Sequence, residues 1–395
     1  STTNIGGVIA PNVISGNTDH GLFLTSCSEI SIRGNKIGTI ANGSIALPNG
    51  IDGVRAIGTD TLTIGGQLEK NIISANTGDG ISLSSCDNST IQGNRIGVPA
   101  DDKNGGVGNG GAGILIENVS TGSLIGGLHS NNEYNVIAGN DGPGIRIIGC
   151  NEHTIQQNSI YGNGGDGIAL EDGANNDISA PFINPPVMGE TPWVTVSLPY
   201  SGVLITVDLF VDDEDEGQIF LGSGTSDSGS FYFYPDLTVY MGKNLTATAT
   251  DEAGNTSQFS TPVLIPYNLT MERTAPVQYL PGQELDITLT LDYTGASPMT
   301  SLAIIEASTM DNWTFKGIVS GTTPGTIPDV DSAAPFSFSW TLDTMPTFPV
   351  TFTYRVFVNY WQTGDIDYTG YAGYRTENHP DEMVLDPVVS LIADD

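Results

Sequence analysis

Six short segments in the first half of the chain begin with asparagine and carry isoleucine two residues later. They start at Asn12, Asn35, Asn71, Asn94, Asn135 and Asn158. A second set begins with glycine and alternates aliphatic with mixed residues, as in GISLSSC and GIRIIGC, and a third set includes EISIRG and TLTIGG. Alternation over short runs predicts strands, and three strands per repeat with Gly, Asn and Asp corners predict stacked coils.

The glycine-initiated strands show which side chains fill the stack, because successive strand residues point to opposite faces. The positions predicted to face inward are all aliphatic: Leu22, Leu24, Val54, Ala56, Ile81, Leu83, Ile114, Ile116, Ile145, Ile147, Ile168 and Leu170. Those predicted to face outward are mixed: Phe23, Arg55, Ser82, Leu115, Arg146 and Ala169. The pattern predicts a right-handed parallel β-helix over residues 1–176, with coils about 4.8 Å apart and a length of roughly 30 Å.

The six asparagines are interpreted as a structural ladder at the corners of the coils. A stacked amide hydrogen-bonds the next coil, and asparagine tolerates a left-handed backbone. We therefore expect these residues to hold the rod together rather than to carry chemistry.

The segments NVISGN, GNKIG, GNRIG and LTIGG resemble the repeat of bacterial extracellular right-handed β-helix proteins. The resemblance covers about residues 4–172. It implies the fold and a secreted or cell-surface location. It implies no activity, because β-helices include lyases, hydrolases, adhesins and structural proteins.

The coil repeat stops after Asp172, and prolines at 185, 186 and 192 follow. Residues 177–268 contain alternating strands and the segment TATDEAGNTS, which resembles immunoglobulin-like modules. Residues 269–395 again alternate long strands with polar turns and look like a second sandwich of immunoglobulin or cohesin type. The predicted fold class is therefore all-β, a β-helix followed by two β-sandwiches.

The chain is strongly acidic, with 45 acidic and 12 basic residues and a net charge of −33. This charge disfavours binding to nucleic acid or to anionic membrane surfaces. No apolar run approaches the roughly 20 residues needed for a membrane-spanning helix, so no membrane insertion is expected.

Three cysteines, Cys27, Cys86 and Cys150, occupy one equivalent position in alternate coils. Two coils separate them by nearly 10 Å, beyond the roughly 7 Å limit between the Cα atoms of a disulfide. They are predicted to be free thiols that fill small spaces.

The strongest candidate for a cofactor site is an acidic run in the first sandwich. Asp212, Asp213 and Asp215 lie in one loop, and Asp251 and Asp208 are expected nearby. Clustered carboxylates suit calcium, which takes six to eight oxygen ligands. The alternative is a solvated acidic turn.

No set of residues forms a convincing catalytic site. The corner acids Asp19, Asp79 and Asp166 lie two or three coils apart, and His20 and His153 are predicted to be isolated surface residues. Extra residues at 39–50 and 98–111 fall on one flank of the rod. They suit a carbohydrate or protein contact, or else are neutral loops.

Aromatic residues concentrate in the last predicted sandwich. One face of the strand over residues 350–361 carries a core set that ends at Tyr360, and the other carries Phe357 and Trp361. Phe357 and Trp361 are candidates for stacking on sugars or for a contact between subunits.

The chain enters the rod at the third strand of a coil, where an open end needs a cover. We expect either upstream sequence or the β-domain of a second copy to supply it, with the final apolar segment either exchanged between copies or completing its own sandwich. The predicted function is therefore that of a non-catalytic extracellular structural protein, a self-assembling subunit of a filament, sheath or adhesin stalk. The alternative is a polysaccharide-binding or polysaccharide-degrading protein.

Overall fold

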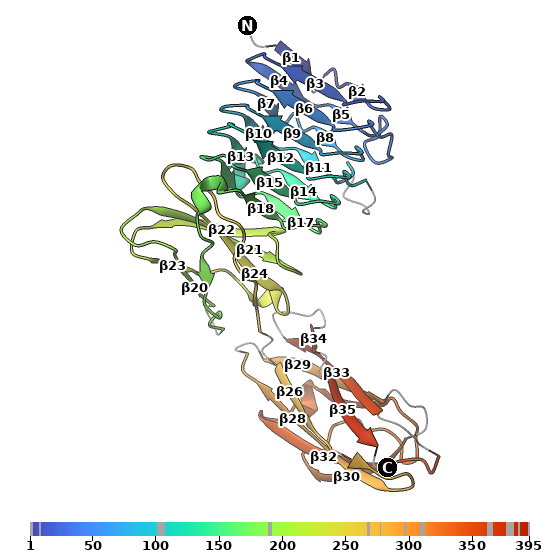
Figure 1. Cartoon of the computed structure of the whole chain (residues 1–395). Coiled ribbons are helices and arrows are strands. Elements are labelled where there is room, and N and C mark those ends of the chain that lie inside the picture. Colours follow the sequence, from blue (N-terminus) through green and yellow to red (C-terminus); the bar gives the residue numbers. More distant parts are fainter. Residues whose placement is uncertain are drawn as a thin grey trace. The chain divides into compact units, whose positions relative to one another are not determined.

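A computed structural model describes residues 3–7, 9–100, 107–188, 192–266, 269–276, 278–295, 298–308, 313–361, 366–376, 383–385 and 388–393. The described residues form β-strands and short 3₁₀ turns, so the all-β prediction is confirmed (Figure 1). Among them, no helix has the length and apolar character that a membrane span requires.

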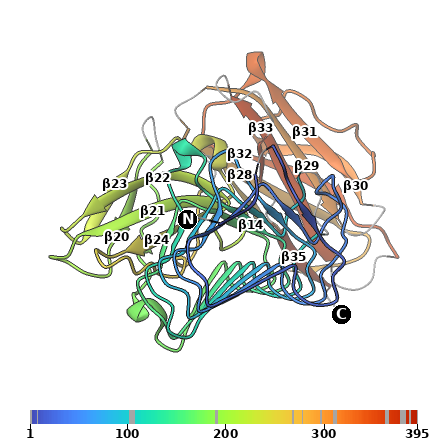
Figure 2. The same ribbon diagram turned by 90° about the horizontal axis from the view of Figure 1, so that it is seen from above.

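The first half of the chain winds into coils that build three parallel sheets of six strands each. The first sheet contains β1 (Thr3–Gly6), β4 (Ile30–Arg33), β7 (Thr63–Gly65), β10 (Thr90–Gln92), β13 (Leu124–Gly126) and β16 (Thr154–Gln156). The second contains β2 (Val13–Ile14), β5 (Lys36–Ile37), β8 (Ile72–Ile73), β11 (Arg95–Ile96), β14 (Val136–Ala138) and β17 (Ser159–Tyr161). The third contains β3 (Leu22–Thr25), β6 (Val54–Ile57), β9 (Ile81–Ser84), β12 (Ile114–Glu117), β15 (Ile145–Ile148) and β18 (Ile168–Glu171). The coils overlap when the rod is viewed along its length (Figure 2).

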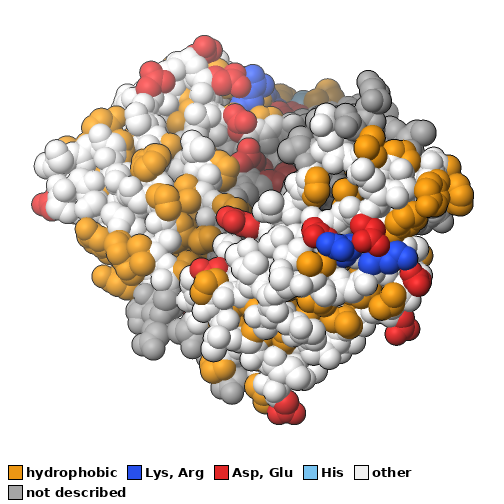
Figure 3. All heavy atoms as spheres, turned by 90° about the horizontal axis from the view of Figure 1, so that it is seen from below, with side chains coloured by type: hydrophobic (Ala, Val, Ile, Leu, Met, Phe, Trp, Pro, Cys, Tyr) orange, Lys and Arg blue, Asp and Glu red, His pale blue; other side chains and the backbone are white. Residues whose placement is uncertain are grey.

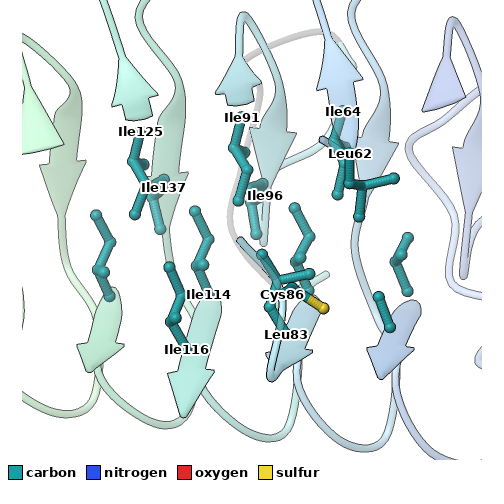
Figure 4. Packing of buried hydrophobic residues seen from close by; sticks show 14 of the residues in the cluster. Leu62, Ile64, Leu83, Cys86, Ile91, Ile96, Ile114, Ile116, Ile125 and Ile137 are labelled. Carbon is teal, nitrogen blue, oxygen red and sulfur yellow. The ribbon is translucent and has the colours of Figure 1, made fainter. Parts of the chain in front are cut away.

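The core of the rod consists of aliphatic columns that repeat from coil to coil. Ile81, Ile114 and Ile145 are in register in the third sheet, and each is fully buried. Side chains from facing strands point into the same interior (Figure 4). Each buried isoleucine contributes about 1.5–3 kcal/mol relative to an exposed one. The inward prediction is confirmed, whereas the outward Ser82 and Ala169 are also buried, and Arg55 donates a hydrogen bond to Ser82.

The predicted asparagine ladder is present. The side-chain amide of Asn71 donates to Oδ1 of Asn94 at 2.9 Å, and that of Asn94 donates to Oδ1 of Asn135 at 3.0 Å. The expectation of a left-handed backbone at these asparagines is wrong. The residue before the asparagine adopts that conformation instead, at Gly34 and Gly93 with φ of 69° and 66°.

A second amide ladder was not predicted. It runs through Asn17, Asn49, Asn76, Asn109, Asn140 and Asn163 with the same head-to-tail pattern. The signal for it was present in the sequence, because an asparagine closes NVISGN, NIISAN, NVIAGN and NSIYGN. The two ladders flank the short strands of the second sheet.

The cysteines are free, as predicted. Cys86 and Cys150 are buried in the rod core, and Cys27 is half-buried beside it. Burial raises the pKa of the Cys150 thiol to about 11, so this thiol is a poor nucleophile at neutral pH.

The first sandwich pairs two sheets. One contains β19 (Phe182–Ile183), β20 (Val194–Ser197) and β23 (Ser230–Phe233), and the other contains β21 (Ile205–Asp212), β22 (Ile219–Ser226), β24 (Asn244–Thr250) and β25 (Val263–Leu264). These strands form one compact unit with the rod, over residues 1–187, 193–236 and 242–265. The rod and this sandwich are therefore more closely joined than the linker after Asp172 suggests.

The second sandwich forms a separate compact unit. Its first sheet contains β26 (Leu269–Thr274), β28 (Glu284–Tyr293), β30 (Thr314–Gly321) and β32 (Val350–Phe357). Its second sheet contains β27 (Gln278–Tyr279), β29 (Met299–Ser308), β31 (Phe336–Thr341), β33 (Ile366–Thr376) and β35 (Val388–Ala393), with β34 (Met383–Leu385) beside β33. Strand β35 pairs with β27 and β33, so the final segment completes its own sandwich here.

Candidate functional site

The last coil of the rod is covered by the first sandwich. Ile160 of β17 and Gly217 exchange two backbone hydrogen bonds of 2.9 Å, which makes an antiparallel bridge between the two folds. Phe259 packs against the rod core and makes an edge-on contact with Phe210, with ring centres 5.6 Å apart. Figure 1 shows β21, β22 and β24 following directly below β17 and β18. The sandwich thus closes the apolar cross-section of its own rod.

Carboxylates of the sandwich occupy the positions that a further coil would take. Glu216 accepts the side-chain amide of Asn163 at 3.0 Å, so it terminates the second asparagine ladder. Asp208 accepts the backbone N–H of Gln157 at 3.0 Å. The donors exposed at the end of the rod are therefore paired rather than left buried and unsatisfied.

A second line of contacts comes from the turn around residue 255. Asn255 accepts the backbone N–H of Glu152 at 2.7 Å, and the Thr256 hydroxyl accepts that of Ile155 at 2.9 Å. Asn175 donates to the carbonyl of Thr256 at 2.9 Å. The TATDEAGNTS segment therefore holds the rod end, a role its sequence pattern did not indicate.

Burial changes the titration of both carboxyl groups at this joint. Desolvation raises the pKa of Asp208 to about 6 and that of Glu216 to about 7, against the hydrogen bonds that lower them. The neighbouring charges of Asp212 and Asp215 raise the pKa of Glu216 further. The folded state therefore binds more protons at these two positions than the unfolded state between about pH 4 and pH 7.

Stability at the joint is expected to fall as pH rises through that window. Each carboxyl contributes roughly 2–3 kcal/mol of this loss, since one pKa unit corresponds to about 1.4 kcal/mol. His153 acts in the opposite sense because burial lowers its pKa to about 4. The measurement is therefore a comparison of urea unfolding of the intact chain with that of the D208N/E216Q variant at pH 5 and pH 7.5. The variant should lose part of the pH dependence, and an unchanged difference between the two pH values would rule out this titration.

The structure does not assemble the predicted calcium ligands. Strand β21 pairs with β24 so that Asp212 lies opposite Asn244, while Thr250, which precedes Asp251, lies opposite Thr206. Six residues of strand separate these ends by roughly 20 Å. In the described ranges, no group of three or more His, Cys, Asp or Glu residues is arranged to hold a metal ion.

The predicted ligands instead have other partners. Asp213 forms an ion pair of 2.5 Å with Lys243, and Asp251 accepts the backbone and side-chain N–H groups of Asn255 at 2.8 and 2.9 Å. Oδ1 of Asp212 accepts the backbone N–H of Asp213, while Asp215 lines a cavity at the joint. The expectation that Asp208 lies beside this loop is wrong, because it pairs with the rod.

The outward charges of the rod mostly pair with one another. Arg146 makes two hydrogen bonds of 2.8 Å with Glu171, and Arg55 bonds Glu117 at 3.1 Å. On the face shown in Figure 3, basic side chains (blue) likewise lie beside acidic ones (red). Such half-exposed pairs contribute little stability, and they neutralise the basic groups that an acidic substrate would need.

Acidic residues at the corners form a structural column that the sequence analysis only partly identified. Oδ1 of Asp52 accepts the backbone N–H of Asp79 at 2.9 Å, and Oδ1 of Asp79 accepts that of Ala112 at 2.7 Å. Nδ1 of His20 accepts the N–H of Asp52 in the same way at 3.2 Å. Asp52 therefore links His20 to Asp79, which the predicted isolation of these residues did not foresee.

The prediction that His153 is a surface residue is wrong. Its side chain is fully buried, and Nδ1 accepts the backbone N–H of Ser123 at 3.4 Å.

A cleft of about 350 Å³ lies on the flank of the rod beside the joint. It is lined by Arg95, His129, Tyr134, Val136, Ser159, Tyr161, Gln218, Ile219 and Phe220. The loop before β14 and strand β22 form its walls, so the predicted flank of inserted loops does border a cavity. The sequence could not show the contribution of β22, because that strand lies in the sandwich.

The predicted contact aromatics differ in exposure. Trp361 is 72% exposed, whereas Phe357 is half-buried with the Lys316 ammonium 5.4 Å from its ring centre. Tyr360 is also 72% exposed, so its assignment to the core is wrong. The strand β32 ends at Phe357, and the alternation that places side chains inward ends soon after it.

Comparison with known proteins identifies one part of the chain. No curated protein sequence matches. Among solved structures, red sea bream transglutaminase aligns over 55% of this chain and 30% of its own, with 11% identity and a TM-score of 0.27. The S. aureus collagen adhesin aligns over 55% of this chain and 94% of its own, with 10% identity and a TM-score of 0.22. The major subunit of aggregative adherence fimbriae type I from Escherichia coli aligns over 32% of this chain and 94% of its own, with 11% identity and a TM-score of 0.21.

These TM-scores are too low to carry an argument about this chain. The family model described as "Right handed beta helix region" does match, over residues 14–183. That range spans the three parallel sheets from β2 onward. The chain therefore contains a right-handed parallel β-helix of this family, followed by antiparallel sheets that fit sandwich domains.

Proposed function

We propose that this chain is a non-catalytic structural protein of an extracellular surface, in which the β-helix is a stiff stalk. The observation that carries this proposal is the continuous stack from the rod into the first sandwich. The ladder of asparagines ends on Glu216, and Phe259 seals the apolar end. A joint with paired donors and a buried ring resists bending, which suits a spacer.

The rest of the rod supports the same function. Its outward arginines pair with glutamates, and its corner aspartates accept backbone N–H groups of the next coil. These groups satisfy structural needs, and they do not converge on a position where a scissile bond would lie. Cleavage of polysaccharides is therefore the less favoured alternative.

The proposal extends to head-to-tail self-association through the first coil. In the described residues, β1, β2 and β3 each pair with strands of the following coil on one side. Ile9 and Phe23, near these edges, are 99% and 57% exposed. The rod-facing surface of the first sandwich is occupied by its own rod, so a second copy would have to offer a different surface.

Electron microscopy and light scattering of the intact chain at several concentrations test this proposal. We expect ordered fibres whose axial repeat is close to one subunit length. Chelator should not change them, because the structure brings no metal ligands together in the part of the chain that it describes. Monomers at every concentration would exclude self-association, and release of products from a panel of polysaccharides would exclude the non-catalytic assignment.

A further inference from the structure

The cleft beside the joint differs in charge from the rest of the molecule. None of its nine lining residues is acidic, although the chain carries 45 acidic residues. A cavity of about 280 Å³ at the same joint is lined by Asp166 and Asp215 and follows the general charge. The cleft therefore has a composition of its own, which the stalk function does not require.

The floor of the cleft is formed by neighbouring strands of the second sheet. Arg95 of β11, Val136 of β14 and Ser159 of β17 are in register at the outward position. Parallel strands place such side chains about 4.8 Å apart. The floor is thus a rigid row whose spacing is close to the dimensions of a sugar ring.

The walls are aromatic and held in place. His129 stacks on Tyr134 with ring centres 4.4 Å apart and on Phe220 of β22 at 5.5 Å. The Ser159 hydroxyl donates to the carbonyl of Gln218 at 2.7 Å, which fixes the sandwich side of the cleft. The stack joins the rod to the sandwich, so both walls are preorganised for a ligand.

The chemistry of the lining suits a saccharide that carries a negative group. Aromatic rings pack against the carbon face of a sugar, and the polar groups of Ser159, Tyr161 and Gln218 can pair with its hydroxyls. The Arg95 guanidinium lies in the cleft, with its Nε donating to the carbonyl of Pro99 at 2.8 Å. The Lys70 ammonium lies 5.6 Å from the Tyr134 ring centre and adds positive charge.

We propose that this cleft binds one or two units of an anionic saccharide. The volume of about 350 Å³ is at the lower end of the roughly 300–1,000 Å³ typical of small-molecule sites. Arginine recognises carboxylate and sulfate groups through planar paired hydrogen bonds, and the lack of acidic lining residues removes the repulsion that prevails elsewhere. A stalk with this cleft would attach to a charged glycan at the rod–sandwich joint.

Binding is tested by calorimetry on the intact chain with three probes: a uronic acid trisaccharide, a sulfated trisaccharide and a neutral glucose trisaccharide. We expect either or both anionic probes to bind, and the preferred one identifies the negative group. The R95Q variant should weaken that binding by about tenfold, the effect of losing one charge-assisted interaction. Y161L, which keeps the apolar volume but removes the ring and hydroxyl, should weaken it as well.

The control is R33Q, which removes a basic charge that pairs with Glu69 elsewhere on the rod. Its affinity should stay within about twofold of the unmodified chain. R95K provides a second test if R95Q does not fold, because it keeps the charge and loses the planar fork. Lack of binding by both anionic probes, equal losses in R33Q and R95Q, or equal affinity for the neutral probe would each overturn the proposal.

Discussion

The Asn94→Ala variant is expected to lose about 3–5 kcal/mol of local stability in the rod. Oδ1 of Asn94 accepts the side-chain amide of Asn71 at 2.9 Å, and its own amide donates to the Ile64 carbonyl at 2.8 Å and to Asn135 at 3.0 Å. The side chain is 1% exposed, so water does not replace these partners in the intact coil. Each unsatisfied buried group costs about 1–3 kcal/mol. Hydrogen exchange of the coil peptides on the intact chain measures the loss.

Two further variants make this test specific. Asn94→Asp keeps the acceptor and loses the donor, so it should destabilise the rod by placing a carboxylate against the Ile64 carbonyl. Asn42→Ala changes an exposed asparagine whose side chain accepts the N–H of Ser44, and it should have little effect. Equal exchange rates in the Asn94 and Asn42 variants would show that the ladder does not stabilise the rod.

Arg273→Met is expected to destabilise the second sandwich by about 3–5 kcal/mol, the typical cost of removing one partner of a buried ion pair. Arg273 and Glu306 are both fully buried at the side chain, and the guanidinium donates to both carboxylate oxygens at 2.6 and 2.8 Å. Tyr354 donates a further hydrogen bond of 2.8 Å to Glu306. Burial raises the pKa of Glu306, and only Arg273 and Tyr354 oppose that effect.

Tryptophan fluorescence during urea unfolding measures this change, since Trp313 and Trp340 lie in the core of the same sandwich. The double variant R273M/E306L should recover most of the stability, because two apolar side chains replace a buried pair at little cost. Arg355→Met is the matched control, as Arg355 pairs with Asp286 at the surface. A loss no greater than that of Arg355→Met would show that the buried pair is not required.

The repeat made the rod predictable from the sequence. Each coil buries the same inward positions, so Ile81, Ile114 and Ile145 repeat with the spacing of the chain itself. The first asparagine ladder followed from the same repetition, and the second could have been found in the final asparagine of NVISGN. Strand alternation was sufficient to predict two sandwiches, because one face of each strand is apolar.

The candidate site was much less predictable. Asp212 and Asp251 are at opposite ends of paired strands, and only the register of β21 and β24 shows this. His153 is buried because the TATDEAGNTS turn covers the last coil, and Tyr360 is exposed because its strand ends at Phe357. Each of these errors arose from an element whose partner lies far away in the chain.

The sequence by itself determined the all-β class, the stacked coils, their apolar interior and the asparagine ladder, because these depend on contacts between repeats of one pattern. The tertiary structure alone decided that Glu216 and Asp208 complete the end of the rod and that Phe220 closes a cleft against His129. Those contacts join residues about 50 to 90 positions apart that belong to no common repeat. Their pairing depends on how the sandwich docks on the last coil, which no local pattern encodes.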